Sequence, residues 1–220
     1  YDSTFGFMGF YIVKPGYRGQ GYGIQIWQAG LDYLEGCTIG LDGVVAQQDN
    51  YRKSGFELAY RNIRYQGTGG GQVPSHPELI DLSSVPFEAI AAYETSFFPA
   101  NRSAFLRAWI AQPGCHAVGM LNGGTLCGYG VIRPCRTGYK IGPLLADSAA
   151  QAKTIFHALK AKVTADDPIF LDAPEVNGAA VALAEEHGMT VSFETARMYN
   201  GPAPNLPLDR IFGVTSFEIG

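Results

Sequence analysis

The stretch that decides the fold is VKPGYRGQGYG, residues 13–23. A strand-like run, Phe5–Val13, leads into it. Apolar residues then recur at helical spacing, at Ile24, Trp27, Leu31 and Leu34. Glycines let a backbone close around a bound group, and a helix N-terminus carries about half a positive charge, so this order predicts an anion-binding loop. The rival interpretation is a glycine turn that caps an ordinary helix.

Two familiar phosphate-binding loops do not fit this stretch. A Walker A loop ends in Lys-Ser or Lys-Thr, and neither pair occurs in or directly after residues 13–23. A Rossmann fingerprint spaces its glycines as G-x-G-x-x-G, whereas Gly19, Gly21 and Gly23 lie two residues apart. Asp42 lies near the distance at which a dinucleotide fold places its acidic residue, so that fold stays open as a minor alternative.

Composition sets further limits on function. The chain has 220 residues, 46% hydrophobic and 16% charged, with a net charge of −4, which excludes global disorder and a basic nucleic-acid binder. The longest uncharged stretch, Ala108–Ile132, is interrupted by glycines and polar residues, so it is no membrane span. The four cysteines form no C-x-x-C pair, so we expect no metal site and a cytoplasmic location.

The residues of the first 65 positions resemble the GNAT superfamily of acyl-CoA-dependent N-acyltransferases. Motif A of that family is an R/Q-x-x-G-x-G/A loop preceded by V-x-P, and the matching residues are Val13, Pro15, Arg18, Gly21 and Gly23. Its motif B is similar to YRKSGF, residues 51–56. The resemblance implies transfer of an acetyl group from acetyl-CoA, as co-substrate, to a small-molecule or peptide amine.

The resemblance also implies roles for individual residues. Splayed strands, the first ending at Ile12 and Val13, would accept the pantetheine chain. The pyrophosphate would bind the loop residues Arg18, Gly19, Gln20, Gly21, Tyr22 and Gly23. Tyr51 would face the sulfur; an ordinary Tyr is a weaker acid than a thiol by about 2 kcal/mol, so we expect it to donate a hydrogen bond to the developing thiolate. The rival interpretation is a core tyrosine with a satisfied hydroxyl.

The sequence departs from the family pattern in two places. The usual asparagine upstream of the motif B tyrosine is absent, since GVVAQQ stands at residues 43–48. The strand before the loop has no acidic residue beyond Asp2, so Asp42, at the end of the next strand, is the candidate general base. The rival interpretation is that Asp42 caps the following helix, which the matching Asp172 favours. Arg197 and Glu218 could line a cleft, although single charges at strand ends are usually solvated.

Two parts of the chain repeat the same pattern at an offset that drifts from 128 to 133 residues. The matches are Pro15 to Leu31 with Pro143 to Leu159, Asp42 with Asp172, Gly55 with Gly188, and Arg64 with Arg197. We therefore expect an α/β protein with tandem GNAT-like mixed sheets flanked by helices. Residues 1–65 form the acyl-CoA-binding part, the glycine-rich residues 66–76 a linker, and residues 77–220 a GNAT-like C-terminal domain.

The repeat also predicts how the two parts differ. Pro143 has 66 residues before it back to Pro77, whereas Pro15 has 14, so the first copy is expected to lack about 52 residues at its N-terminus. The second copy has Ala146, Asp147 and Ala149 near the positions of the loop arginine and glycines, and a carboxylate repels a pyrophosphate. We therefore expect one CoA per chain, bound in the first copy.

The remaining expectations concern the acceptor. We expect the acceptor pocket between the copies, with the last predicted strand, Ile211–Ile219, in its wall. Two rival functions stay open, a non-catalytic acyl-CoA-binding sensor and an unrelated nucleotide binder.

Overall fold

The computed structural model describes residues 1–220. The chain forms one mixed sheet of ten strands, against which helices pack. The strands are β1 (Phe5–Met8), β2 (Thr38–Val44), β3 (Glu57–Thr68), β4 (Leu79–Asp81), β5 (His116–Asn122), β6 (Thr125–Pro134), β7 (Tyr139–Ala146), β8 (Pro168–Pro174), β9 (Thr190–Tyr199) and β10 (Ile211–Gly213). Their order is β1-β2-β9-β3-β8-β7-β6-β5-β4, with β10 paired to β7 off this path.

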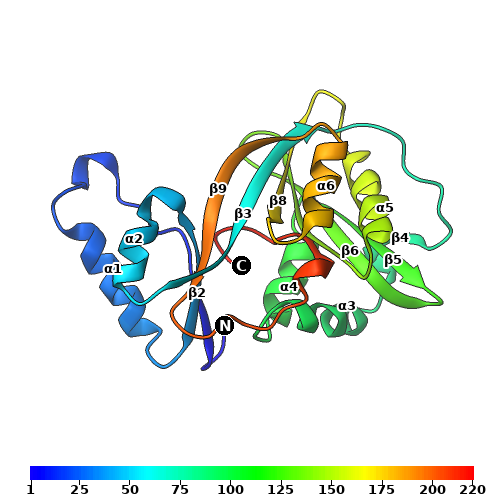
Figure 1. The fold of residues 1–220 in the computed structure, drawn as a ribbon. Helices are drawn as coiled ribbons and strands as arrows, with labels where there is room; N and C mark the ends of the chain where they lie inside the picture. Colours follow the sequence, from blue (N-terminus) through cyan, green and yellow to red (C-terminus); the bar gives the residue numbers. More distant parts are fainter.

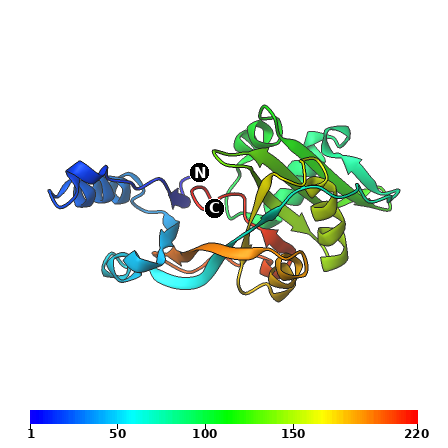
Figure 2. The same ribbon diagram turned by 90° about the horizontal axis from the view of Figure 1, so that it is seen from above.

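Helices flank the sheet in two groups. They are α1 (Tyr22–Tyr33), α2 (Gln48–Lys53), α3 (Phe87–Glu94), α4 (Ser103–Ile110), α5 (Ala149–Lys160) and α6 (Gly178–Glu186). Helices α1 and α2 stand apart from the other four, and the long strands β3 and β9 run between the groups (Figure 1). In the view from above, both termini lie between the two halves (Figure 2). The predicted α/β class, a mixed sheet flanked by helices, is confirmed.

The two parts of the chain share this sheet instead of forming one sheet each. The order β1-α1-β2-α2-β3 of the first part recurs as β7-α5-β8-α6-β9 in the second. However, β3 inserts between β8 and β9, and β2 pairs with β9. The first part therefore contributes β3 to the sheet of the second part, and the second part contributes β9 to the sheet of the first. The origin of this arrangement in a duplication stays a hypothesis.

The exchanged strands bring the repeated acidic and basic residues together. Asp42 on β2 lies opposite Arg197 on β9, and Asp172 on β8 lies opposite Arg64 on β3. Both pairs are ion pairs with a fully buried carboxylate. The positions that match in sequence therefore have the same structural role, which is to join the two parts of the sheet.

Two boundaries differ from those expected from the sequence. The first strand ends at Met8 and not at Val13, because the C-terminal segment crosses there: a Cβ at Gly9 would overlap the Glu218 carbonyl group. The predicted linker begins too early, since Gln66–Thr68 still pair with β8. The last strand is also shorter than expected and covers only Ile211–Gly213.

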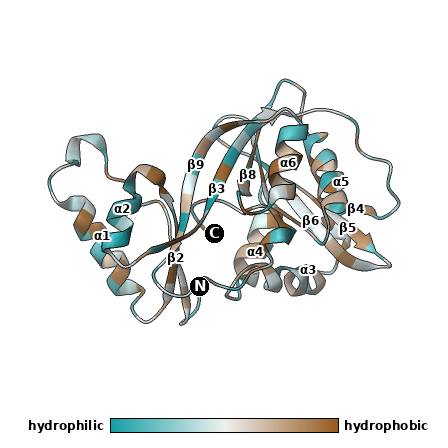
Figure 3. Cartoon of the chain, viewed as in Figure 1, coloured by the Kyte–Doolittle hydropathy of each residue, from teal (hydrophilic) through white to brown (hydrophobic).

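The largest part of the core lies under α5. Its inward residues Ile155, Phe156 and Leu159 have no exposed area, and they belong to a cluster that includes β7 and β8. Strands β3 and β9 carry both hydrophobic and hydrophilic residues (Figure 3). At the end of β9 the consecutive residues Thr195–Tyr199 are all buried, so both faces of the sheet are covered there. The first part has a smaller core, in which Trp27 is the one buried residue of α1. No helix is long and apolar enough to cross a membrane.

A pair of histidines joins α5 to α6 and predicts a pH dependence of stability. The Nε2 atoms of His157 and His187 lie 2.5 Å apart, and Nδ1 of His187 is 2.7 Å from the Leu183 carbonyl oxygen. Burial lowers the pKa of His157, and the charges of His187, Lys153 and Lys160 lower it further. The unfolded chain therefore binds a proton at His157 at a higher pH than the folded chain does.

We expect the wild-type protein to lose stability as the pH falls below about 6.5, the ordinary histidine value, down to the lowered pKa of the folded state. A His157→Gln variant should lose less over the same range, which urea unfolding at a series of pH values from 7.5 to 5 will measure. His116→Gln, at an exposed site on β5, is the matched control and should follow the wild type. Parallel curves for wild type and His157→Gln would contradict the expectation.

Candidate active site

The sheet opens into a cleft where β1 and β2 part. The two strands pair in parallel from Phe5 with Thr38 to Met8 with Leu41. Beyond this point β2 continues to Val44 along β9, while the chain after Met8 turns away. The resulting cleft has a volume of about 340 Å³. Its lining residues are Met8, Gly9, Phe10, Tyr11, Ile12, Trp27, Leu41, Asp42, Gly43, Val44, Tyr51, Arg64, Phe193, Thr195, Phe217 and Glu218.

Both parts of the chain contribute to the walls of this cleft. The first part supplies the segment Gly9–Ile12, the end of β2 and Tyr51. The second part supplies residues of β9 and the C-terminal residues Phe217 and Glu218. The C-terminus lies beside β9 between the two halves in both ribbon views (Figures 1 and 2). A substrate in the cleft would therefore touch both parts.

Tyr51 lies in the cleft at the start of motif B. Its ring packs against Gly43, where a Cβ would overlap it, and its centroid is 5.5 Å from that of Trp27. Burial raises the pKa of the Tyr51 phenol, and a contact with the backbone N–H of Val44 partly opposes this. The phenol therefore stays protonated at neutral pH and can donate a hydrogen bond into the cleft.

The glycine-rich loop leads into α1 without a side-chain cap. Gly19 and Gly21 have φ of 74° and 83°, values that favour glycine, and Gly21 is the N-cap residue of α1. The first N–H groups of a helix have no partner within it, so those of α1 can bind an added anion. Arg18 lies at the edge of this loop, where its Nε donates to the Val13 carbonyl at 3.0 Å.

The other predicted cofactor-binding residues lie within the loop, at the start of α1, or in the segment before the loop. Gln20 donates from Nε2 to the Gly16 carbonyl at 2.9 Å, and Tyr22 and Gly23 form the first turn of α1. Ile12 is 71% exposed and, like Val13, lies in an irregular segment and not on a strand. The backbone that faces β2 across the cleft is therefore that of Gly9–Ile12.

The structure corrects the expectation that Asp42 is the general base. Its carboxylate is fully buried and accepts hydrogen bonds from Nε and Nη2 of Arg197, at 2.9 and 2.6 Å, and from Nδ2 of Asn62 at 2.8 Å. Both oxygens are thus directed at protein donors and are poorly placed to accept a proton from a substrate. Asp42 does not cap α2 either, because Gln47 is the N-cap residue there.

Glu218 is the acidic residue that the chain does place in the cleft. It lies beyond the last strand and is half-buried, and its carboxylate accepts a hydrogen bond from Ser216 Oγ. The sequence suggested that Glu218 could line a cleft but offered no link to Tyr51, which stands 167 positions earlier. The crossing of the C-terminal segment over Gly9 provides that link.

The corresponding opening in the second part is closed. Strands β7 and β8 pair in parallel over Tyr139–Ile141, as β1 and β2 do, but β10 then pairs with β7, and the Val214 N–H donates to the Asp172 carbonyl at 2.9 Å. Helix α5 is capped by its own Ser148, and Asp147 before it forms an ion pair with Arg210. The second part therefore offers neither a cleft between these two strands nor an uncapped loop after the first of them.

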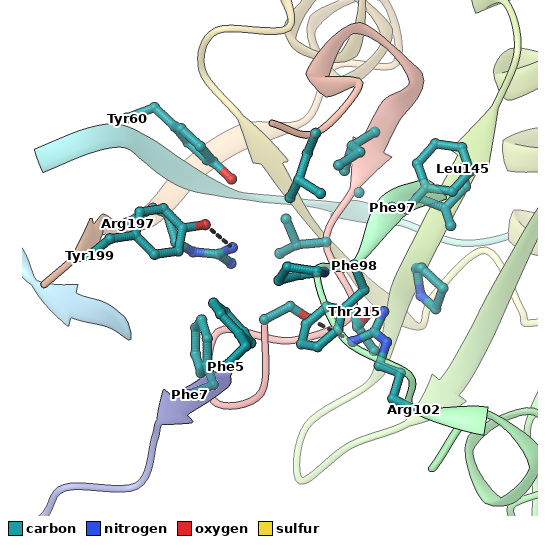
Figure 4. Close-up of a pocket in the computed structure, with 17 residues that line it drawn as sticks. Phe5, Phe7, Tyr60, Phe97, Phe98, Arg102, Leu145, Arg197, Tyr199 and Thr215 are labelled. Carbon is teal, nitrogen blue, oxygen red and sulfur yellow. Dashed lines mark hydrogen bonds between the residues drawn. The ribbon is translucent and has the colours of Figure 1, made fainter. Parts of the chain in front are cut away.

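A smaller cavity lies between the two halves. Aromatic side chains of both parts and the guanidinium groups of Arg197 and Arg102 surround it (Figure 4). Arg102 is buried, paired with Glu94, and donates to Thr215 Oγ1 at 3.0 Å. The cavity volume is about 30 Å³, which holds a water molecule or two but no acceptor. This region is a packed interface.

The comparisons with known proteins agree with the fold. Residues 90–213, more than half of the chain, match a family model described as an acetyltransferase (GNAT) domain. The chain belongs to the GNAT family of acetyltransferases, which confirms the family that motifs A and B indicated, although the matched residues lie outside both motifs. Members of this family depend on acyl-CoA, and acyl transfer is the class of reaction they perform. No cluster of three or more His, Cys, Asp or Glu that could hold a metal ion is present.

Individual relatives span the whole chain. It is 28% identical over 220 residues to holothin acyltransferase of Pseudoalteromonas sp. (strain SANK 73390), covering 100% of this chain and 75% of that protein. A crystal structure described as a candidate acetyltransferase from Pyrococcus horikoshii has a TM-score of 0.84 at 22% identity and covers 100% of this chain and 74% of that one. A tandem GNAT protein from the clavulanic acid biosynthesis pathway has a TM-score of 0.59 at 15% identity, covering 88% and 74%. Both solved structures are similar to this chain in fold.

Proposed function

We propose that this protein transfers an acetyl group from acetyl-CoA to an amine, with one CoA bound in the first part of the chain. The observation that carries the proposal is the contrast between two equivalent openings. The opening between β1 and β2 is a cleft of about 340 Å³, whereas β10 fills the opening between β7 and β8. This contrast supports one co-substrate site per chain, at the opening between β1 and β2.

The cleft and the loop suit the two ends of the co-substrate. The pantetheine arm would lie between the backbone of Gly9–Ile12 and that of Asp42–Val44, which lack strand partners on these sides. The pyrophosphate would lie at Arg18–Gly23, against the positive end of α1. The thioester would then lie near Tyr51.

The reaction can be written with residues of the cleft. The neutral amine nitrogen attacks the thioester carbonyl carbon, so that a C–N bond forms and the C–S bond breaks. Glu218 accepts the proton that the nitrogen loses, directly or through a water. Tyr51 donates a hydrogen bond to the departing sulfur as negative charge develops on it, since full proton transfer from a phenol to a thiolate is uphill.

Two measurements on the full chain test the proposed function. Release of free thiol from acetyl-CoA should depend on added amine, in a screen over amines of different charge. Calorimetric titration with acetyl-CoA should give a stoichiometry near one. Tight CoA binding without thiol release from any amine would favour the non-catalytic sensor. A stoichiometry near two, or displacement of CoA by ATP or NAD at equal concentration, would overturn the proposal.

The loop makes a separate prediction about affinity. An Arg18→Ala change removes a charge-assisted contact to the pyrophosphate, worth about 1.5–3 kcal/mol, so we expect CoA to bind about 10–150-fold more weakly. Titration calorimetry at fixed ionic strength will measure the change. Arg107→Ala removes an exposed arginine of α4 and is the matched control, expected to keep wild-type affinity. Equal affinities for Arg18→Ala and wild type would contradict the loop assignment.

A further inference from the structure

Another pocket lies next to the cleft, and two residues separate the two spaces. Its volume is about 300 Å³. Arg64 and Glu218 line both the cleft and this pocket. The lining residues are Arg64, Arg133, Cys135, Arg136, Thr137, Lys140, Phe170, Ser216 and Glu218. A molecule whose amine lies beside Glu218 in the cleft can therefore extend into the pocket.

The pocket is strongly basic in a protein that is acidic as a whole. Four of its lining residues are cationic, and Glu218 is the one acidic residue among them. Asp172, which is fully buried, pairs with Arg64 and Lys140 and neutralises part of this charge. The chain as a whole has a net charge of −4, so the excess of positive charge is a local property.

Much of the hydrogen-bonding capacity in the pocket is unused. Arg64 donates to Asp172 from Nε and Nη2, which leaves Nη1 for another partner. Arg133 donates one hydrogen bond, from Nη1 to the Pro134 carbonyl at 3.5 Å, and its guanidinium lies over the Trp109 ring at 4.8 Å from the centroid, but its buried Nε has no hydrogen-bond partner. Arg136 is exposed at the rim. Native structures rarely leave a buried donor unpaired, and such a group calls for an explanation.

Strand register explains how these residues meet. Arg133 on β6 lies opposite Lys140 on β7, which lies opposite Phe170 on β8. Arg64 comes from the first part of the chain, through the insertion of β3 beside β8. The pocket therefore exists only because the two parts share one sheet.

We propose that this pocket binds an anionic group, a carboxylate or a phosphate, carried by the acceptor amine. The inference rests on the proposed function, because it assigns the amine end of the same molecule to Glu218. Arginine is suited to this task, since its planar fork binds both oxygens of a carboxylate or phosphate. The preferred acceptor is thus an amine with an acidic group, and not a purely cationic amine of the kind that the acidic composition would favour.

The first arm of the test uses inorganic phosphate and needs no turnover. Phosphate should shift the amide NMR signals of Arg133–Lys140 and Ser216–Glu218 in the full-length protein, with and without saturating CoA. In the double variant Arg133→Gln with Arg136→Gln, phosphate should bind about tenfold more weakly. Lys160→Gln with Lys162→Gln removes the same charge at the end of α5 and should have no effect. Phosphate binding that is absent, or equal in all three proteins, would overturn the proposal.

The second arm asks whether the anion belongs to the acceptor. The affinities of 4-(aminomethyl)benzoate and of 4-methylbenzylamine are compared by NMR titration, again with and without CoA. The carboxylate should bind about tenfold more tightly to the wild type, and the double arginine variant should lose this preference. Phosphate binding without any such preference would make the pocket a site for free anions and overturn the acceptor assignment.

Failure of the proposed function can be distinguished from failure of the acceptor assignment. If CoA does not bind, or no amine releases thiol, the proposed function fails whatever the pocket binds. If instead the double arginine variant loses CoA affinity as Arg18→Ala does, the pocket belongs to CoA, and the acceptor assignment is wrong while the transferase proposal stands.

Discussion

Replacing Asp42 with asparagine is expected to lower the free energy of unfolding by about 3–5 kcal/mol, the usual effect of removing one partner of a buried ion pair. Arg197 is 4% exposed, and Asp42 is its sole ion-pair partner. An arginine cannot escape this situation by losing its proton. The substitution therefore leaves a buried positive charge without compensation, at the pairing that joins β2 to β9. Urea unfolding followed by circular dichroism will measure the loss.

Two further variants separate this effect from a general one. Asp49→Asn removes an exposed carboxylate that pairs with Arg52 on α2, and we expect a change below about 1 kcal/mol. Asp42→Asn combined with Arg197→Met removes both charges and should recover much of the lost stability. The opposite pattern, wild-type stability with a large loss of turnover in Asp42→Asn, would restore Asp42 as the general base.

Replacing Glu218 with glutamine is expected to lower kcat by about 10²–10⁴-fold, the usual contribution of a general base. Glutamine keeps the shape of the side chain and can still accept the hydrogen bond from Ser216, but it cannot take a proton from the amine. CoA affinity should change little, because the charge that is removed does not lie at the pyrophosphate loop. Steady-state kinetics and calorimetry of the same preparation will separate the two effects.

A rescue experiment shows whether Glu218 acts as a base or only shapes the cleft. Added formate should restore part of the lost rate in a Glu218→Ala variant, because a small carboxylate can occupy the vacated space. Glu185→Gln, an exposed position on α6, is the control and should keep the wild-type rate. A Glu218→Gln variant with wild-type kcat would show that another group, or solvent, takes the proton.

Local signals in the sequence were sufficient to predict the loop, the helix after it and the family. Glycines at 19 and 21 adopt positive φ, and Trp27 faces inward from α1, as the spacing predicted. These features depend on the conformations that neighbouring residues allow and on one helical period, so they can be derived without knowledge of the rest of the chain. The YRKSGF motif forms the end of α2 and the turn after it, and packing against Gly43 and Trp27 places Tyr51 in the cleft; its catalytic role stays a prediction.

The repeat predicted more than the local signals but less than the full topology. It matched Asp42 with Asp172 and Arg64 with Arg197, and these residues do have equivalent positions. It did not reveal that each aspartate pairs with the arginine of the other part. Sequence spacing specifies which residues share a role, whereas strand order is decided by which strands hydrogen-bond edge to edge in the folded sheet.

The sequence by itself therefore determined the α/β class, the GNAT family and the loop before α1. Only the tertiary structure decided the role of Asp42, whose partner Arg197 is 155 residues away, the arrival of Glu218 in the cleft and the closure of the second opening by β10. The physical reason is the range of the interactions. Backbone preferences and helical periods act between neighbours, whereas ion pairs and strand pairing form between segments that the folded sheet alone brings together.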